Sequence, residues 1–163
     1  MQQQIVLFPS DSGISELRGV LKLIKDNNRA HTMKMSELLF HSHKRFEELN
    51  GILQSCKLLG LVTVNNGTIR LTRTGAQMKV DNFRSMLKSY LIEIEPFKAT
   101  REALRHREHM STKELSQYLR HRGVAFVTDE KQNEELLRYV LLKWAVRSGL
   151  LEYDVHSDRW RTL

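Results

Sequence analysis

The feature that most constrains the fold is a pattern that the chain uses twice: an amphipathic helix, a glycine and a short β-hairpin. The first copy spans residues 46–72. Its apolar residues recur at helical spacing and stop before Gly60. Two short segments rich in β-branched residues then flank Asn66-Gly67, a dipeptide that favours a tight hairpin turn. The helical stripe consists of Phe46, Leu49, Leu53 and Cys56.

The second copy spans residues 129–163, and Gly149 follows its helix. Residues 150–153 and 159–162 are predicted to pair across a polar turn. A shorter helix containing Glu-Leu precedes each copy, so that the repeated unit is helix, helix and a two-stranded wing, the order typical of a winged helix. The apolar stripe of the second copy consists of Leu136, Leu137, Val140, Leu141, Trp144 and Ala145.

A length of 163 residues accommodates two such units. The predicted fold class is α+β, mostly α, with two tandem winged-helix domains joined by helices. Residues 1–82 form the first winged-helix domain, and residues 83–163 form the linking helices and the second. Residues 2–9 are expected to form an arm with a possible short strand. The linking helices are expected over residues 83–91 and 96–107, with Pro96 in a first helical turn.

Within the first domain, periodicity predicts a helix from Ile14 to the polar residues 26–28 and a short helix over residues 35–40. Ser42 is placed to begin a third helix, whose first turn then contains His43, Lys44 and Arg45. Thr72 is placed to cap a helix that follows the first wing. In the second domain, Ser111 and Glu114 have the spacing of a capping box.

The charge balance points to a polyanionic partner. Net charge is +7 and the sequence pI is about 9.7, which favours nucleic acid through long-range attraction and counterion release. The single cysteine, Cys56, lies on an apolar helical stripe, so a reducing, cytoplasmic location is expected. No segment has the pattern expected of a signal peptide or of a membrane-spanning helix, and membrane insertion is not expected.

The two domains differ in the residues that open their third helices. The first offers a candidate DNA-binding set of His43, Lys44, Arg45, Arg70 and Arg73. The second opens with four acidic residues and one basic residue between positions 129 and 135, a surface that phosphates repel. The second domain and the linking helices are therefore predicted to form a protein interface through Arg101, Arg105, Asp129, Glu130 and Glu134.

Several of these segments resemble the AAA-associated C-terminal domain family of archaea and bacteria over nearly the full length of the chain. The similar segments are residues 14–17, residues 58–61, residues 69–72 with Gly75, and Trp144 with Leu150, Leu151, Tyr153 and Asp154. Residues 145–147 read Ala-Val-Arg where the family usually has Gly-Arg-Tyr. The resemblance implies a module that follows the ATPase subunits of anion-type ABC transporters and that also exists as a free-standing protein.

Catalysis, a cofactor and a metal site are not expected. The sequence has neither a Gly-x-x-x-x-Gly-Lys loop nor a Gly-x-Gly-x-x-Gly turn, so it lacks the usual means of cradling a nucleotide phosphate. His41 with His43, and His106 with His109 on a predicted helix, have spacings that allow two ligands to share an ion. No further ligand motif completes either set, and surface histidines are the simpler interpretation.

Two functions from different classes fit these observations. The first is a non-catalytic transcription regulator that binds double-stranded DNA through residues 1–82. The alternative is a regulatory adaptor that docks on an ABC transporter ATPase subunit. Homodimerisation through the exposed parts of the linking helices is a further expectation, because palindromic sites require a two-fold partner.

Overall fold

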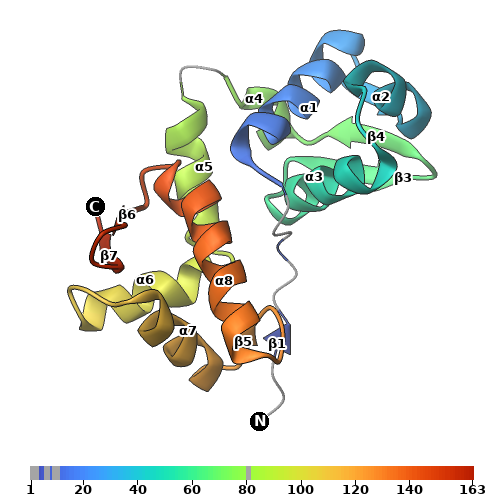
Figure 1. Ribbon diagram of the computed structural model, residues 1–163. Helices are drawn as coiled ribbons and strands as arrows, with labels where there is room; N and C mark the ends of the chain where they lie inside the picture. Colours follow the sequence, from blue (N-terminus) through green and yellow to red (C-terminus); the bar gives the residue numbers. More distant parts are fainter. Residues whose placement is uncertain (1–3, 6–7, 9–11, 80–81) are drawn as a thin grey trace. The chain divides into compact units, whose positions relative to one another are not determined.

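The structure is a computed structural model that describes residues 4–5, 8, 12–79 and 82–163. It confirms an α+β protein that is mostly helical. The chain divides into two compact units: Asp11–Asn82, and Phe83–Leu163 together with Met1–Ser10. Below, these are called unit 11–82 and unit 83–163. Figure 1 labels most of the elements of both.

Unit 11–82 has the order helix, strand, helix, helix and hairpin, followed by one short helix. Its three strands form an antiparallel sheet in the order β2-β4-β3. The sequence predicts a two-stranded wing, but the structure adds a third strand, β2, which runs beside β4 with Met33 opposite Ile69. The elements are α1 (Ile14–Asn27), β2 (Thr32–Lys34), α2 (Met35–Ser42), α3 (Phe46–Leu58), β3 (Val62–Asn65), β4 (Thr68–Leu71) and α4 (Arg73–Gln77).

The turns of unit 11–82 follow the predicted chemistry. Gly60 ends α3 at φ +71°, a conformation that glycine adopts without a side-chain clash. Asn66 and Gly67 both have positive φ, as a two-residue hairpin turn requires. Thr72 accepts a hydrogen bond from the backbone N–H of Gly75 and so caps α4. The wing is thereby held in register against its own helix.

The start of α3 differs from the prediction. Ser42 is the last residue of α2, and His43 ends that helix with φ +54°. Arg45 is the N-cap, and α3 begins at Phe46. His43, Lys44 and Arg45 therefore form the connection between two helices and not the first turn of α3, because the left-handed conformation at His43 interrupts the helical path.

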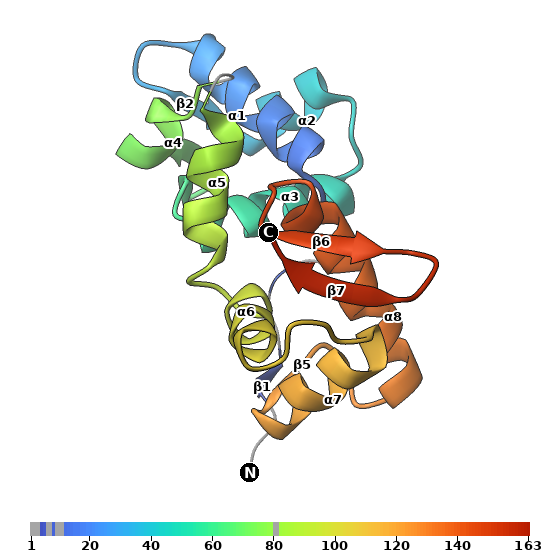
Figure 2. The same ribbon diagram turned by 90° about the vertical axis from the view of Figure 1, so that its left-hand side faces the viewer.

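Unit 83–163 begins with α5 (Phe83–Leu91) and α6 (Phe97–His106), as predicted for the linking helices. Figure 2 shows the β6-β7 hairpin of this unit together with α6, α7 and α8. The long helix α8 continues directly into a π-helical turn, η1, which the sequence did not indicate. The remaining elements are α7 (Thr112–His121), β5 (Val124–Ala125), α8 (Glu130–Val140), η1 (Leu141–Val146), β6 (Leu151–Asp154) and β7 (Arg159–Thr162).

The order helix, strand or bridge, helix, helix and hairpin occurs in both units, and unit 83–163 has α5 and β5 in addition. In unit 11–82, β2 lies between α1 and α2 and pairs with β4. In unit 83–163, Met110 lies between α6 and α7 and forms a bridge with Trp160 on β7. Both backbone N–H groups of this bridge donate to the opposite carbonyl. Met110 thus takes the place of β2, reduced to one residue.

The N-terminal arm belongs to unit 83–163, whereas the predicted boundary assigned it to residues 1–82. Gln4–Ile5 forms β1, which pairs in parallel with Val124–Ala125 of β5. The ring of Phe8 is buried and packs edge-on against Phe97 at 5.2 Å and Trp144 at 4.9 Å. The other residues of the predicted arm, 2–3, 6–7 and 9, lie outside the described residues.

Candidate functional site

The exposed face of α3 is the central surface of the candidate site. Glu47, Asn50 and Lys57 are exposed and Gln54 is half-buried, while Leu49, Ile52, Leu53 and Cys56 face the core. The spacing of three and four residues places the polar side chains on one side of the helix. This face carries hydrogen-bond donors and acceptors and one cation, which is the chemistry that reads base edges.

The predicted DNA-binding residues lie at opposite ends of α3. His43, Lys44 and Arg45 precede the helix, and the helix leads into β3, whose Thr63 is paired with Arg70 on β4. A helix of thirteen residues spans about 20 Å. Arg73 follows the same hairpin at the start of α4. The structure therefore keeps the predicted cations in two separate groups, one before α3 and one on β4 and α4 after it.

The sheet of unit 11–82 adds a cation, Lys34, to the predicted set. Met33, Ile69 and Leu71 are buried, so the intervening side chains project from the other face of the sheet. Lys34 on β2 and Arg70 on β4 are both exposed there. The signal that could have identified Lys34 was the alternation of residues 32–34, which is too short to predict a strand by itself.

Charge pairing in unit 11–82 leaves most of these cations available. Arg45 forms an ion pair with Glu48 at 3.0 Å, so its charge is partly neutralised. Among the described residues, no acidic side chain pairs with Lys44, Arg70 or Arg73. Glu47 is exposed and carries the one negative charge on the polar face of α3 defined above.

In unit 83–163 the residues predicted as a protein interface mostly contact their own unit. Asp129 is the N-cap of α8 and accepts a hydrogen bond from the backbone N–H of Gln132 at 2.8 Å. Glu130 lies 3.4 Å from Arg120, and Glu134 lies 3.6 Å from Arg138. These acids lie near the positive end of their helix and near arginines of the same unit. Such internal contacts explain the acidic cluster without an external protein partner.

The two basic members of that predicted interface, Arg101 and Arg105, lie on α6, one half-buried and the other exposed. The helix ends at His106, and Arg107 is its C-cap. His106 and His109 are therefore not on one helix as predicted, because α6 ends before His109. His109 instead lies 3.8 Å from Glu108.

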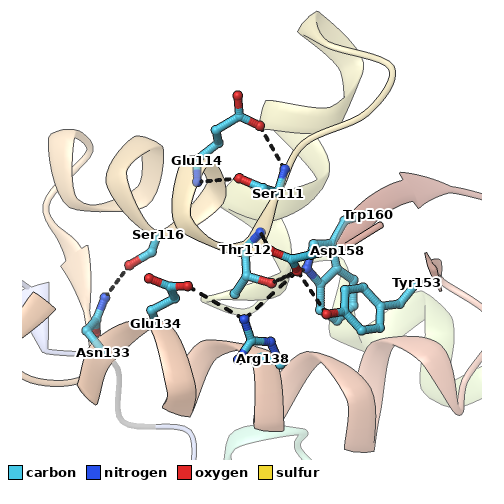
Figure 3. A network of polar contacts seen from close by, with 10 residues as sticks. All are labelled: Ser111, Thr112, Glu114, Ser116, Asn133, Glu134, Arg138, Tyr153, Asp158 and Trp160. Atoms are coloured by element: carbon cyan, nitrogen blue, oxygen red, sulfur yellow. Dashed lines mark hydrogen bonds and ion pairs between the residues drawn. The ribbon is translucent and has the colours of Figure 1, made fainter. Parts of the chain in front are cut away.

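A polar network joins the hairpin of unit 83–163 to α7 and α8 (Figure 3). Asp158, in the turn between β6 and β7, accepts hydrogen bonds from the hydroxyls of Thr112 at 2.6 Å and Tyr153 at 2.8 Å. Thr112 in turn accepts one from the indole N–H of Trp160 at 2.8 Å. Arg138 of α8 lies 3.9 Å from the same carboxylate. The network fixes the hairpin on both helices.

This network shifts the pKa of its members. Partial burial raises the pKa of Asp158, but the hydrogen bonds from Thr112 and Tyr153 outweigh it, and the pKa lies below its ordinary value. Burial, followed by the bond to Asp158, raises the pKa of Tyr153. The backbone N–H of Ser111 lowers the pKa of Glu114, its capping-box partner. These shifts are explained by structural contacts.

Cys56 is a core residue, as its place on the apolar stripe predicted. It is fully buried, and this burial raises the pKa of its thiol to about 12. A thiol in this environment stays protonated and behaves as a small apolar group. Trp144 and Trp160 are likewise fully buried, in agreement with a core role and not with base stacking.

Together, the fold and the exposed residues define a protein of two α+β units, each with a hairpin that follows its helices, in which one unit presents a polar, cation-flanked helix. Comparison with protein families matches the C-terminal AAA-associated domain over residues 27–154. The chain belongs to this family, as its sequence resemblance indicated. No curated protein and no solved structure gives a significant match.

The family match covers parts of both units, so neither unit alone corresponds to it. None of the helices among the described residues has the length and apolar character needed to cross a lipid bilayer.

Proposed function

We propose that this chain is a non-catalytic, tandem winged-helix protein that binds double-stranded DNA through unit 11–82 and regulates transcription. The observation that carries the proposal is the exposed face of α3, where Asn50, Gln54 and Lys57 lie between two groups of cations. In a helix-turn-helix the corresponding helix enters the major groove.

Each part of the surface has a role in this proposal. Asn50 and Gln54 carry the amide groups that pair with adenine, and Lys57 suits guanine or a phosphate. Lys44 precedes the helix, and Arg70 and Arg73 follow it, at positions suited to the backbone on either side of the groove. The helix length of about 20 Å matches roughly six base-pair steps.

The test is a titration of the full chain against a mixed-sequence duplex at two salt concentrations. We expect micromolar or tighter binding that weakens steeply with salt. The double variant K44A/R70A should weaken binding and lower the salt slope by about 2, because two phosphate contacts are lost. Absence of binding at low salt would end the proposal.

A substitution at Glu47 should change DNA affinity in the opposite direction. Its carboxylate lies on the same face of α3 and opposes phosphate charge. Glu47→Gln should tighten DNA binding, whereas Glu135→Gln, an equal change at an exposed position of α8 in the other unit, should leave it nearly unchanged. Equal effects of the two variants would show that only net charge matters.

Family membership favours a second function, a regulatory adaptor that docks on an AAA-type or ABC transporter ATPase subunit. An adaptor needs an exposed anchor for a protein partner, and aromatic residues are enriched at such positions. Tyr139 on α8 is 47% exposed, with the ammonium of Lys143 at 4.4 Å from its ring centroid.

This second function is tested by affinity purification of the tagged full chain from its own cells. An ATPase subunit recovered in equimolar amount, and lost with Tyr139→Ala, would support the adaptor. Recovery that is the same with Tyr139→Ala would remove α8 as the docking surface. Recovery of no ATPase would leave DNA binding as the proposed function.

A further inference from the structure

Three cations form a stripe along the exposed side of α6, and we propose that this stripe binds the phosphate backbone of duplex DNA. It consists of Lys98, Arg101 and Arg105 and is called the α6 stripe. The inference rests on the proposed function, because it names the same ligand, but it assigns that ligand to a second surface, on the unit whose long helix is acidic.

The spacing of the stripe follows from the helix. Positions 98, 101 and 105 are separated by three and four residues and therefore share one side of α6. The opposite side is buried and consists of Phe97, Ala99, Thr100, Ala103 and Leu104. Because that side holds α6 in the core, the stripe is fixed in its outward orientation.

Ion pairing distinguishes the stripe from most other arginines of the unit. Six arginines of unit 83–163 each lie within 4 Å of an acidic side chain: Arg107, Arg120, Arg122, Arg138, Arg159 and Arg161. Among the described residues, Arg101 and Arg105 have no such partner, and neither does Lys98. Cations with no internal partner are the ones that remain available to an external anion.

The acid nearest the stripe in sequence is already neutralised. Glu102 on α6 lies 3.3 Å from the guanidinium of Arg122 on α7. The side of α6 that carries the stripe thus holds three positive charges and no unpaired negative charge. A linear series of cations without an apolar anchor suits a regularly charged backbone better than a protein pocket.

Phosphate contacts of this kind contribute affinity and position without reading sequence. In this proposal a unit whose helix α8 is acidic contributes to DNA binding through the phosphate contacts of α6. An acidic protein surface is the competing occupant, and the experiment separates the two.

The experiment compares two triple variants of the full chain, each of which removes three positive charges. The first is K98A/R101A/R105A. The matched control is K113A/K131A/R147A, three exposed cations of the same unit that lie off α6. Binding to a mixed-sequence duplex is measured by fluorescence anisotropy across a series of salt concentrations.

We expect the α6 variant to lower the slope of log K against log salt by about 2 to 3, since each lost phosphate contact contributes about 0.9. The control variant should change the slope by less than about 1. Equal slopes for the two variants, with binding by the unaltered chain intact, would overturn the inference and favour an acidic protein partner. No binding by the unaltered chain would overturn both the inference and the proposed function. Circular dichroism of both variants verifies that they fold.

Discussion

The helices α3 and α8 each precede the hairpin of their unit, yet their exposed faces differ in charge and in ion pairing. At the start of α3 the N-cap Arg45 pairs with Glu48, and farther along the helix Glu47, Asn50 and Lys57 are exposed. On α8, Asp129 caps the helix, and Glu130 and Glu134 pair with arginines of the same unit. The same backbone arrangement is thus compatible with an external ligand in one unit and with internal ion pairs in the other.

The comparison also extends to how each hairpin is held. In unit 11–82 a third strand covers β4 over three residues. In unit 83–163 that strand is one bridge at Met110, and the polar network around Thr112 and Asp158 supplies the remaining connection. A three-residue ladder in one unit and a set of side-chain hydrogen bonds in the other therefore both hold a hairpin in place.

Both tryptophans and all four tyrosines lie within residues 83–163. Intrinsic fluorescence therefore reports on unit 83–163 alone, while far-ultraviolet circular dichroism reports on both units. This difference allows each of the following predictions to be assigned to one unit.

The largest expected effect is that of Phe8→Ala on unit 83–163. Loss of a buried aromatic ring between Phe97 and Trp144 should cost about 3 to 5 kcal/mol. The fluorescence transition in urea should shift to lower concentration. Phe46→Ala, at a ring that is 55% exposed in unit 11–82, is the control and should cost about 0.5 kcal/mol or less. An unmoved fluorescence transition in Phe8→Ala would show that the arm does not belong to this unit.

Gly75→Ala should act on the other unit. A Cβ at Gly75 would lie 2.1 Å from the carbonyl oxygen of Leu61, so the backbone must move at a cost of about 3 kcal/mol. The denaturation midpoint of unit 11–82, followed by circular dichroism, should fall. The fluorescence midpoint, which reports on unit 83–163, should stay unchanged. Gly19→Ala on α1 should be neutral or stabilising by up to about 1 kcal/mol. Outside the backbone of its own helix, no atom would lie within 4 Å of the new Cβ. Similar effects of both changes would contradict the close packing of α4.

Thr112→Val tests the network of unit 83–163. It removes the acceptor of the Trp160 indole N–H and a donor to Asp158, and leaving a buried polar group unpaired costs about 1 to 3 kcal/mol. Urea denaturation followed by fluorescence measures the loss. Thr162→Val, at an exposed position of β7 in the same hairpin, is the matched control. If the two variants are equally stable, the network does not hold the hairpin.

The smallest expected effect is a pH dependence of unit 83–163. The pKa of Asp158 is lower in the folded state, so its contribution to stability is present above its unfolded pKa of about 4 and is lost as pH falls through the folded pKa. The fluorescence midpoint in urea should therefore decrease on acidification below about pH 4. Asp158→Asn should flatten this part of the profile. Asp26→Asn, an exposed change in unit 11–82, should not, and an equal flattening would rule out Asp158 as the cause.

Much of the fold could be predicted because it depends on short-range patterns. Gly60 and Gly149 after their helices, the Asn66-Gly67 turn and the capping box at Ser111 are local signals, and the structure has each of them. The predicted apolar stripe before Gly60 is buried except for Phe46, which is 55% exposed. The family was likewise evident in the sequence and is confirmed by the match over residues 27–154. The DNA-binding and protein-interface residues are not tested by these observations and stay predictions.

Other features escaped the sequence because they depend on distant partners. The strand at residues 32–34 is too short for a recognisable alternation, and Met110 becomes a strand position only because Trp160 lies opposite it. The polar face of α3 was not predicted, because Glu47 and Glu48 stand next to it in the sequence. The sequence placed His43, Lys44 and Arg45 inside the helix, since nothing local predicted the left-handed conformation at His43.

The sequence by itself determined the helices, the hairpins, the basic charge and the family, because periodicity, turn residues and composition act over a few residues at a time. Only the tertiary structure decided which cations remain unpaired, which acids form ion pairs within their own unit and which unit contains Phe8. Those outcomes depend on contacts between residues up to 136 positions apart, as between Phe8 and Trp144, and no local pattern encodes them.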